Sequence, residues 1–153
     1  MNTAEDMLRE KGGGVISMPQ DAMILEALRV MVDNKISAIA VKNAERIVGI
    51  WTGRDLMRDT LTSGFDPSST RLGDKMDTRP RSYPHTHNIY ALMDIFLGRR
   101  LRHLLIEKDG KCLGLLSVGD VMRACLQEKA EQLKELHAMA SWEYHEEWKW
   151  GRR

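Results

Sequence analysis

The sequence predicts an α+β fold in which two pseudo-symmetric repeats pack face to face through their sheets and a long C-terminal helix follows. The run Gly114–Asp120 repeats the pattern of Gly49–Asp55, an interval of 65 residues from 49 to 114. The same shift superposes other residues of like type: Ser17 on Ser82, Pro19 on Pro84, Val41 on Ile106, Met57 on Met122, Arg58 on Arg123 and Leu61 on Leu126. Such a duplication predicts two copies of one structural unit, and two copies are too few for a solenoid.

Short apolar runs and turn residues predict the elements of the first repeat. Apolar residues at helical spacing indicate helices, and short apolar runs bounded by turn residues indicate strands. A short helix within 2–11 comes first and ends at three glycines. The expected elements then follow in the order strand, helix, strand, strand, helix: 15–17, 24–32, 36–41, 46–50 and 53–61.

The second repeat is predicted in the same way after a linker. Residues 62–78 are rich in Thr, Ser, Gly and Pro, with a single helical turn at 72–76. A strand, a helix and two strands follow at 81–83, 89–97, 101–106 and 112–116, with Asp109-Gly110 as the hairpin turn. The boundaries that we expect are 1–61 for the first unit, 62–78 for the linker, 79–128 for the second unit and 129–153 for a helical extension.

The helical extension is longer than the domain needs. From Val118 to about Trp148 the chain has no proline and, after Gly119, no glycine, while apolar residues recur three or four apart. About 30 helical residues would extend about 45 Å. Since the segment also carries Trp142 and Trp150, we expect it to build a homodimer or to dock a partner. Folding back on its own domain and fraying after residue 140 are the alternatives.

Each copy of the duplicated run places a polar pair at the start of a helix. Thr52 or Ser117 stands at the N-cap, and Asp55 or Asp120 follows three residues later, as in a capping box. Free backbone amides and the positive end of the helix dipole favour a phosphate there. The carboxylate can accept from donors such as ribose hydroxyls. One copy alone indicates a plain helix cap, whereas two copies in a repeat favour a nucleotide site.

The pattern of an apolar strand, Gly-apolar-apolar-Thr/Ser-x-x-Asp and a helix resembles the CBS domain, and the tandem resembles the paired CBS unit called a Bateman module. The resemblance spans roughly residues 12–128. The second copy is the better match, with Arg99–Ile106, Asp109-Gly110-Lys111 and the Ser117 turn in family order. Leu105 and Ala40 stand where many relatives carry proline, a departure that leaves the polar groups of the site unchanged.

The resemblance implies a non-catalytic regulatory sensor that binds an adenine nucleotide in clefts between the repeats and signals energy or redox state to a separate effector protein. AMP is the first expectation, with ATP, ADP or NAD as alternatives. By the same resemblance, the two aspartates hold the ribose, Thr52 and Ser117 lie near the phosphate, and strand residues enclose the purine. The residues expected to bind the ligand are Ile16, Ile36, Ala38, Thr52, Arg54, Asp55, Arg81, Leu101, Arg102, His103, Ser117 and Asp120.

A basic cluster predicts that the two clefts differ. Alternation along a strand sends Arg102 and His103 to opposite faces, so we expect one of them to face the cleft beside Ser117. Their counterparts in the first repeat, Ser37 and Ala38, carry no charge. We therefore expect the second site to bind a phosphorylated adenosine ligand and the first to bind more weakly or to take a less charged one.

Composition disfavours several other functions. The chain of 153 residues has 23 basic and 22 acidic side chains, a balance that disfavours nucleic-acid binding. No apolar run approaches a membrane span, and the N-terminus lacks the layout of a signal peptide. Cys112 and Cys125 have no metal-like spacing and are interpreted as reduced core thiols. We therefore expect a cytoplasmic protein without membrane contact.

Catalysis and metal binding have little support in the sequence. Asp55 and Asp120 lack a nucleophile or an oriented base as partner. His85 and His87 have no companion ligand at a suitable spacing, and His137 and His145, two helical turns apart, are too far from each other to hold one ion without outside ligands. The alternative from another functional class is a structural scaffold whose clefts are empty and whose role is to dimerise and to display the Trp-rich helix. The two aspartates favour the sensor, because a scaffold would need them only for helix capping.

Overall fold

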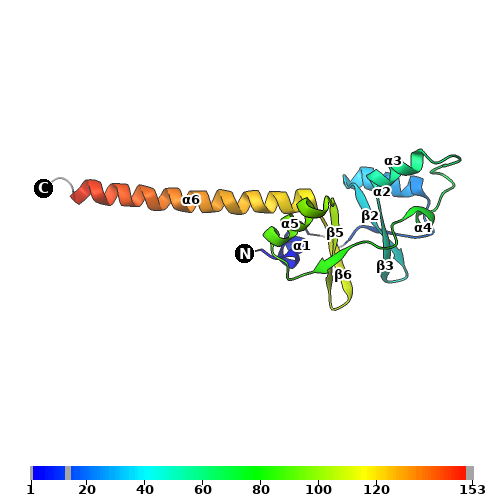
Figure 1. Ribbon diagram of the computed structural model, residues 1–153, viewed down its shortest axis with the longest axis horizontal. Helices are drawn as coiled ribbons and strands as arrows, with labels where there is room; N and C mark the ends of the chain where they lie inside the picture. The colour runs from blue at the N-terminus through cyan, green and yellow to red at the C-terminus, as the bar shows by residue number, and fades with distance from the viewer. Residues whose placement is uncertain (1, 13–14, 151–153) are drawn as a thin grey trace.

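The computed structural model describes residues 2–12 and 15–150, and side chains as far as Ser141. Two three-stranded sheets, ordered β1-β2-β3 and β4-β5-β6, belong to the two repeats. The repeats lie next to each other, and the last helix projects far beyond both of them (Figure 1). The predicted α+β arrangement of two repeats and a long C-terminal helix is confirmed.

The two repeats have the same order of elements and the same strand pairing. The first contains β1 (Ser17–Pro19), α2 (Ile24–Asn34), β2 (Ala38–Asn43), β3 (Arg46–Thr52) and α3 (Gly53–Thr60). The second contains β4 (Ser82–Pro84), α5 (Ile89–Arg99), β5 (His103–Lys108), β6 (Lys111–Ser117) and α6 (Val118–Trp150). In each sheet the first strand runs parallel to the middle strand, which runs antiparallel to the third.

The first two strands of each repeat begin one or two residues later than the apolar runs predict. β2 continues into the polar residues Lys42 and Asn43, because ladder hydrogen bonds join backbone groups and do not require apolar side chains. β1 includes Pro19, which an edge strand tolerates since its missing N–H costs no ladder bond. Ile16 and Ile36, expected inside strands, instead lie just before β1 and β2.

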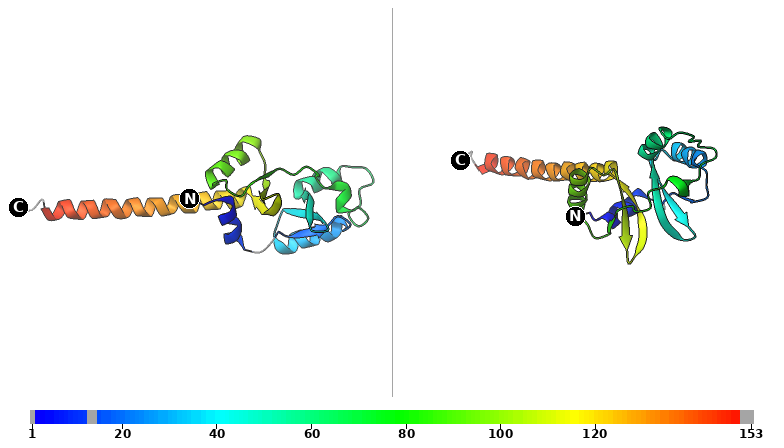
Figure 2. Two further views of the ribbon diagram at one scale, coloured as in Figure 1. Left: turned by 90° about the horizontal axis from the view of Figure 1, so that it is seen from below. Right: turned by 45° about the vertical axis from the view of Figure 1, so that its right-hand side comes forward.

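Two connecting helices exchange places between the repeats. Helix α1 (Ala4–Lys11) precedes the first repeat in the chain, yet Ala4 and Met7 are buried in the core of the second. Helix α4 (Leu72–Lys75) precedes the second repeat, yet Leu72 is buried in the core of the first. The views of Figures 1 and 2 agree in placing α1 beside β5 and β6, and α4 beside β2 and β3. The repeats are therefore interlocked rather than independent.

Helix α6 has 33 residues, which correspond to a length of about 50 Å. Its exposed apolar side chains include Leu126, Leu133 and Leu136. The side chains of Trp142, Trp150 and their neighbours in the last turns lie outside the described residues. None of the helices in the described part of the chain combines the length and apolar character needed to cross a membrane.

Candidate functional site

Two polar turns stand at equivalent places, where β3 enters α3 and where β6 enters α6. Thr52 Oγ1 accepts from the backbone N–H of Asp55 at 3.3 Å, and Asp55 Oδ2 accepts from the backbone N–H of Thr52 at 3.0 Å. Ser117 and Asp120 make the same two hydrogen bonds, at 3.1 and 2.9 Å. Both capping boxes predicted from the sequence are formed, and each holds its carboxylate at the start of a helix.

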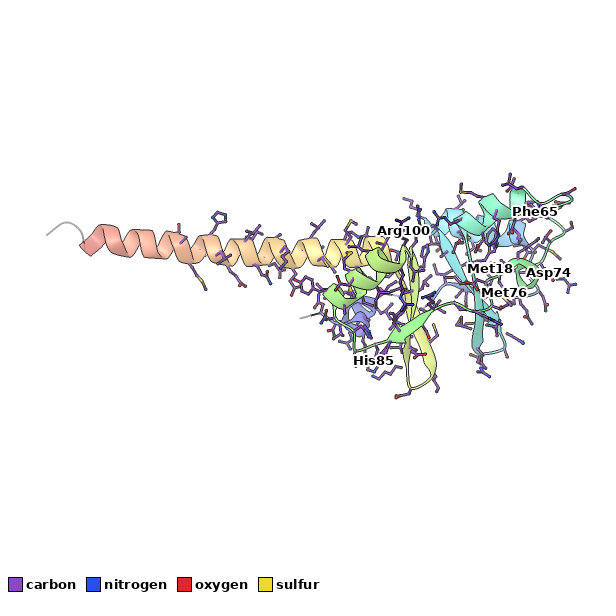
Figure 3. All side chains as sticks on the ribbon, viewed as in Figure 1. Met18, Phe65, Asp74, Met76, His85 and Arg100 are labelled. Carbon is purple, nitrogen blue, oxygen red and sulfur yellow. The ribbon has the colours of Figure 1, made fainter. Side chains whose placement is uncertain are left out.

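The larger of two clefts, about 790 Å³ in volume, is built crosswise from the two repeats. The first repeat contributes Thr52, Arg54 and Asp55 from the turn into α3. The second repeat contributes residues that precede or begin its strands: Arg79, Pro80, Arg81, Arg100, Leu101, Arg102 and His103. Figure 3 shows Arg100 on the side of the second repeat that faces the first. Seven of the residues predicted to bind the ligand therefore share this cleft.

The smaller cleft, about 460 Å³, combines strand residues of both repeats with helix α1. Its lining includes the predicted residues Ile16, Ile36 and Ala38, and across from them Leu113, Gly114 and Leu115 of β6. Lys11 of α1 also lines this cleft and joins it to the second polar turn. Its Nζ donates to Asp120 Oδ2 at 2.9 Å and to the carbonyl oxygen of Leu115 at 3.2 Å.

Arg102 and His103 do not point to opposite faces, as alternation along a strand predicts. Arg102 and His103 both line the cleft that holds Thr52 and Asp55. Alternation does not separate them, because β5 begins at His103 and Arg102 lies in the preceding loop. His103 is paired with Ser117 in the β5–β6 ladder, but the charged side chain of Arg102 lines the cleft that contains Asp55. The cleft with the larger number of basic side chains is therefore the one that contains Asp55, and not one that contains Ser117 and Asp120.

The larger cleft carries a positive charge. Five arginines line it, against the acidic side chains of Asp55 and Asp77. His103 Nε2 lies 3.1 Å from Ser37 Oγ. Burial lowers the pKa of His103, and the charges of Lys11 and Arg102 act in the same direction while Asp120 opposes them. The imidazole is therefore neutral at pH 7, and the positive charge of the cleft comes from the arginines.

The carboxylate of Asp120 is engaged on both oxygens. Oδ2 accepts from Lys11 and from the backbone N–H of Ser117, and Oδ1 accepts from Arg123 Nη2 at 2.9 Å. Burial by itself raises the pKa of Asp120, but the hydrogen bonds from Ser117 and Lys11 and the charge of Lys11 outweigh it, so the pKa lies below its usual value. Asp120 is thus held ionised.

Sequence reasoning missed Lys11, Arg79 and Arg100 as cleft residues. Arg100 belongs to a basic cluster that was visible in the sequence, and Arg79 follows the linker directly. Lys11 had no local signal, because the residue that it contacts, Asp120, is 109 positions away in the chain.

His85 and the two cysteines, the other residues with potential chemical roles, lie outside both clefts. Glu5 of α1 accepts from Lys108 Nζ at 3.0 Å, and its second oxygen lies 3.0 Å from His85 Nδ1 (His85 is labelled in Figure 3). Cys112 and Cys125 are free thiols and are half-buried, and burial raises the pKa of Cys112. Across residues 2–12 and 15–141, no group of three or more His, Cys, Asp or Glu side chains could hold a metal ion.

Comparison with known proteins agrees with this duplicated architecture. The family model described as CBS domain matches residues 5–61 and 72–127. The chain is similar to the CBS domain-containing protein CBSX3, mitochondrial, of Arabidopsis thaliana, with 30% identity over 145 residues that cover 89% of this chain and 70% of that protein.

Solved structures share the fold. A CBS-domain containing protein from Agrobacterium tumefaciens is 31% identical with a TM-score of 0.73, over 80% of this chain and 98% of that one. A CBS domain protein from Pyrobaculum aerophilum complexed with AMP is 20% identical with a TM-score of 0.70, over 85% of this chain and 99% of that one. The matched segments coincide with the two interlocked repeats, and the chain therefore belongs to the CBS-domain family, with two CBS domains in tandem.

Proposed function

We propose that this protein is a regulatory module that binds an adenine nucleotide in the larger cleft and transmits its occupancy to a partner protein. The observation that carries the proposal is the crosswise cleft, in which Thr52 and Asp55 of one repeat face the arginines of the other. A ligand that bridges the repeats favours one arrangement of them. It shifts the population toward that arrangement in proportion to its differential affinity.

Each part of a nucleotide has a matching group in the larger cleft. Asp55 is an acceptor for ribose hydroxyls, and Thr52 with the start of α3 offers donors to phosphate. Leu101 offers apolar contact to the purine, and the arginines compensate the phosphate charge. The AMP complex of the Pyrobaculum protein supports AMP as the first ligand to test, with ADP, ATP and NAD as alternatives.

Thermal melting with each of these four ligands, followed by calorimetry, tests the proposal. A ligand at about 100 times its Kd would stabilise the fold by about 2.7 kcal/mol, which a melting curve detects. Asp55→Ala should remove most of the shift, whereas Asp74→Ala, at an exposed position of α4, should leave it unchanged. If none of the four ligands shifts the melting of folded, nucleotide-free protein, the sensor is contradicted and the scaffold alternative is favoured.

We further propose that the protein forms a homodimer through an apolar face that meets a second copy of the chain. Met57 of α3 and Leu61, which directly follows α3, are exposed, and so are the residues at the equivalent positions in α6, Met122 and Leu126. Equivalent exposed positions on pseudo-symmetric helices suit a twofold contact, and Leu133 extends the apolar surface along α6.

The dimer is tested by light scattering after size-exclusion chromatography. The double variant Leu126→Glu/Leu133→Glu should be a monomer at concentrations where the wild type is a dimer. Leu97→Glu is the matched control, because Leu97 is comparably exposed but belongs to α5. A wild-type protein that is monomeric at all concentrations tested would contradict this contact.

A further inference from the structure

The polar turn of the second repeat already has an occupant. Lys11 Nζ donates to Asp120 Oδ2 at 2.9 Å and to the carbonyl oxygen of Leu115 at 3.2 Å. Asp120 is the residue in the second repeat that is equivalent to Asp55, and its side chain is only 16% exposed. A ribose hydroxyl that is to donate to Asp120 must therefore share or replace the position of the ammonium group.

The first repeat has a different residue at the equivalent position. The shift of 65 residues places Met76 opposite Lys11, and a thioether cannot donate a hydrogen bond to a carboxylate. Met76 lies against Gly49 of β3, where Figure 3 labels it beside the first sheet. Asp55 is joined by Arg58 of its own helix, at 3.3 Å, just as Asp120 is joined by Arg123. The two aspartates thus differ in whether a connecting helix reaches across to them.

Helix α1 positions the backbone of Lys11 next to the second polar turn. Its first turn is tied to the second repeat by the backbone N–H of Ala4, which donates to the carbonyl oxygen of His87 at 2.7 Å. Glu5 adds the ion pair with Lys108. Because the helix is anchored, the Lys11 backbone stays within reach of Asp120, and the local concentration of its ammonium group is high.

Ser117 and Asp120 do not themselves line the smaller cleft, and Lys11 lies between that cleft and Asp120. We propose that Lys11 is a built-in competitor for a ribose that reaches Asp120 from the smaller cleft, so that it makes this cleft the weaker of two nucleotide sites. This inference rests on the proposed nucleotide-binding function. The contact is partly exposed, with 44% of the Lys11 side chain accessible. Its loss should therefore raise the affinity of the smaller cleft by about tenfold, in the range of one partly exposed charge-assisted contact.

The test measures ligand binding in a background in which the larger cleft is weakened, so that the smaller cleft dominates. Calorimetry with adenosine, and separately with AMP, compares Asp55→Ala with Asp55→Ala/Lys11→Met, since Asp55→Ala weakens the larger cleft. Methionine is chosen because Met76 occupies the equivalent position. Adenosine carries no phosphate, so loss of the Lys11 charge does not offset the gain at the ribose. Asp55→Ala/Lys108→Met is the matched control, because it removes a lysine that anchors α1 without touching Asp120.

A Kd about tenfold lower for adenosine in the Lys11→Met variant, with a much smaller change in the Lys108→Met control, is the expected result. An unchanged or higher Kd, or an equal gain in the control, overturns the inference. The wild-type protein then separates the two proposals. If it binds AMP and loses that binding with Asp55→Ala, the proposed function stands without the competitor, and if it binds none of the four nucleotides, both fail.

Discussion

The indole Nε1–H of Trp51 donates to Asp59 Oδ2 at 3.0 Å inside the core of the first repeat. Trp51 is fully buried, and Asp59 is 3% exposed. The equivalent positions of the second repeat, 65 residues further on, hold Leu116 and Ala124. One core therefore depends on a buried polar pair at a place where the other has two apolar side chains.

Replacing Asp59 should test how far the first repeat depends on this pair. Asp59→Ala leaves the indole N–H buried without an acceptor, so we expect a loss of about 1–3 kcal/mol in the free energy of unfolding. Asp59→Asn keeps an acceptor oxygen and should lose less. Urea unfolding followed by circular dichroism measures both variants. Equal losses in the two variants would show that the hydrogen bond to Trp51 is not the cause.

Two equivalent glycines should differ in their tolerance of a methyl group. A Cβ on Gly49 would lie 2.8 Å from the backbone oxygen of Asp77 and 2.6 Å from Met76 Sδ. A Cβ on Gly114 would lie 2.6 Å from Leu8 Cδ2, the end of a side chain that can rotate away. Gly49→Ala should therefore cost about 1–3 kcal/mol, and Gly114→Ala less. Thermal melting of the matched pair compares them, and the reverse order would contradict the explanation.

His103 should make folding stability fall in mild acid. Burial lowers the pKa of His103 in the folded protein, with Lys11 and Arg102 adding to the effect against Asp120. The folded state is therefore favoured by a neutral His103. This contribution to the free energy of unfolding is fully present above the unfolded pKa of about 6.5 and is lost as the pH falls from there toward the folded pKa. His103→Gln should therefore show a smaller drop in Tm between about pH 7.5 and about pH 5.5. Parallel Tm curves for wild type and variant would refute this assignment.

Nucleotide binding in the larger cleft should depend on salt. The arginines that line this cleft attract the phosphate of AMP electrostatically. Because dissolved salt screens this attraction, the Kd for AMP should rise between about 0.05 and about 0.5 M NaCl. Arg102→Ala should raise the Kd about tenfold at low salt and flatten the salt dependence. Arg46→Ala, on the β2–β3 hairpin, is the control and should change neither quantity. A Kd independent of salt would place the phosphate away from the arginines.

The sequence predicted the features that depend on residues close together in the chain. The duplication predicted both repeats, and the spacing of Thr52 to Asp55 and of Ser117 to Asp120 predicted both capping boxes. These boxes join residues three positions apart, so their geometry follows from local backbone conformation. The strand boundaries were less accurate, because β2 continues into Lys42 and Asn43 through backbone hydrogen bonds that side-chain polarity does not reveal.

Tertiary structure decided how the two halves combine. The exchange of α1 and α4 brings Lys11 to Asp120, and the packing of the repeats places Arg102 and His103 in the same cleft as Asp55. Neither arrangement has a local signal, because each joins residues that are far apart in the chain. The sequence by itself determined the repeated unit and the two polar turns. The structure determined which charges meet at each turn, since those contacts depend on how the repeats are placed against each other.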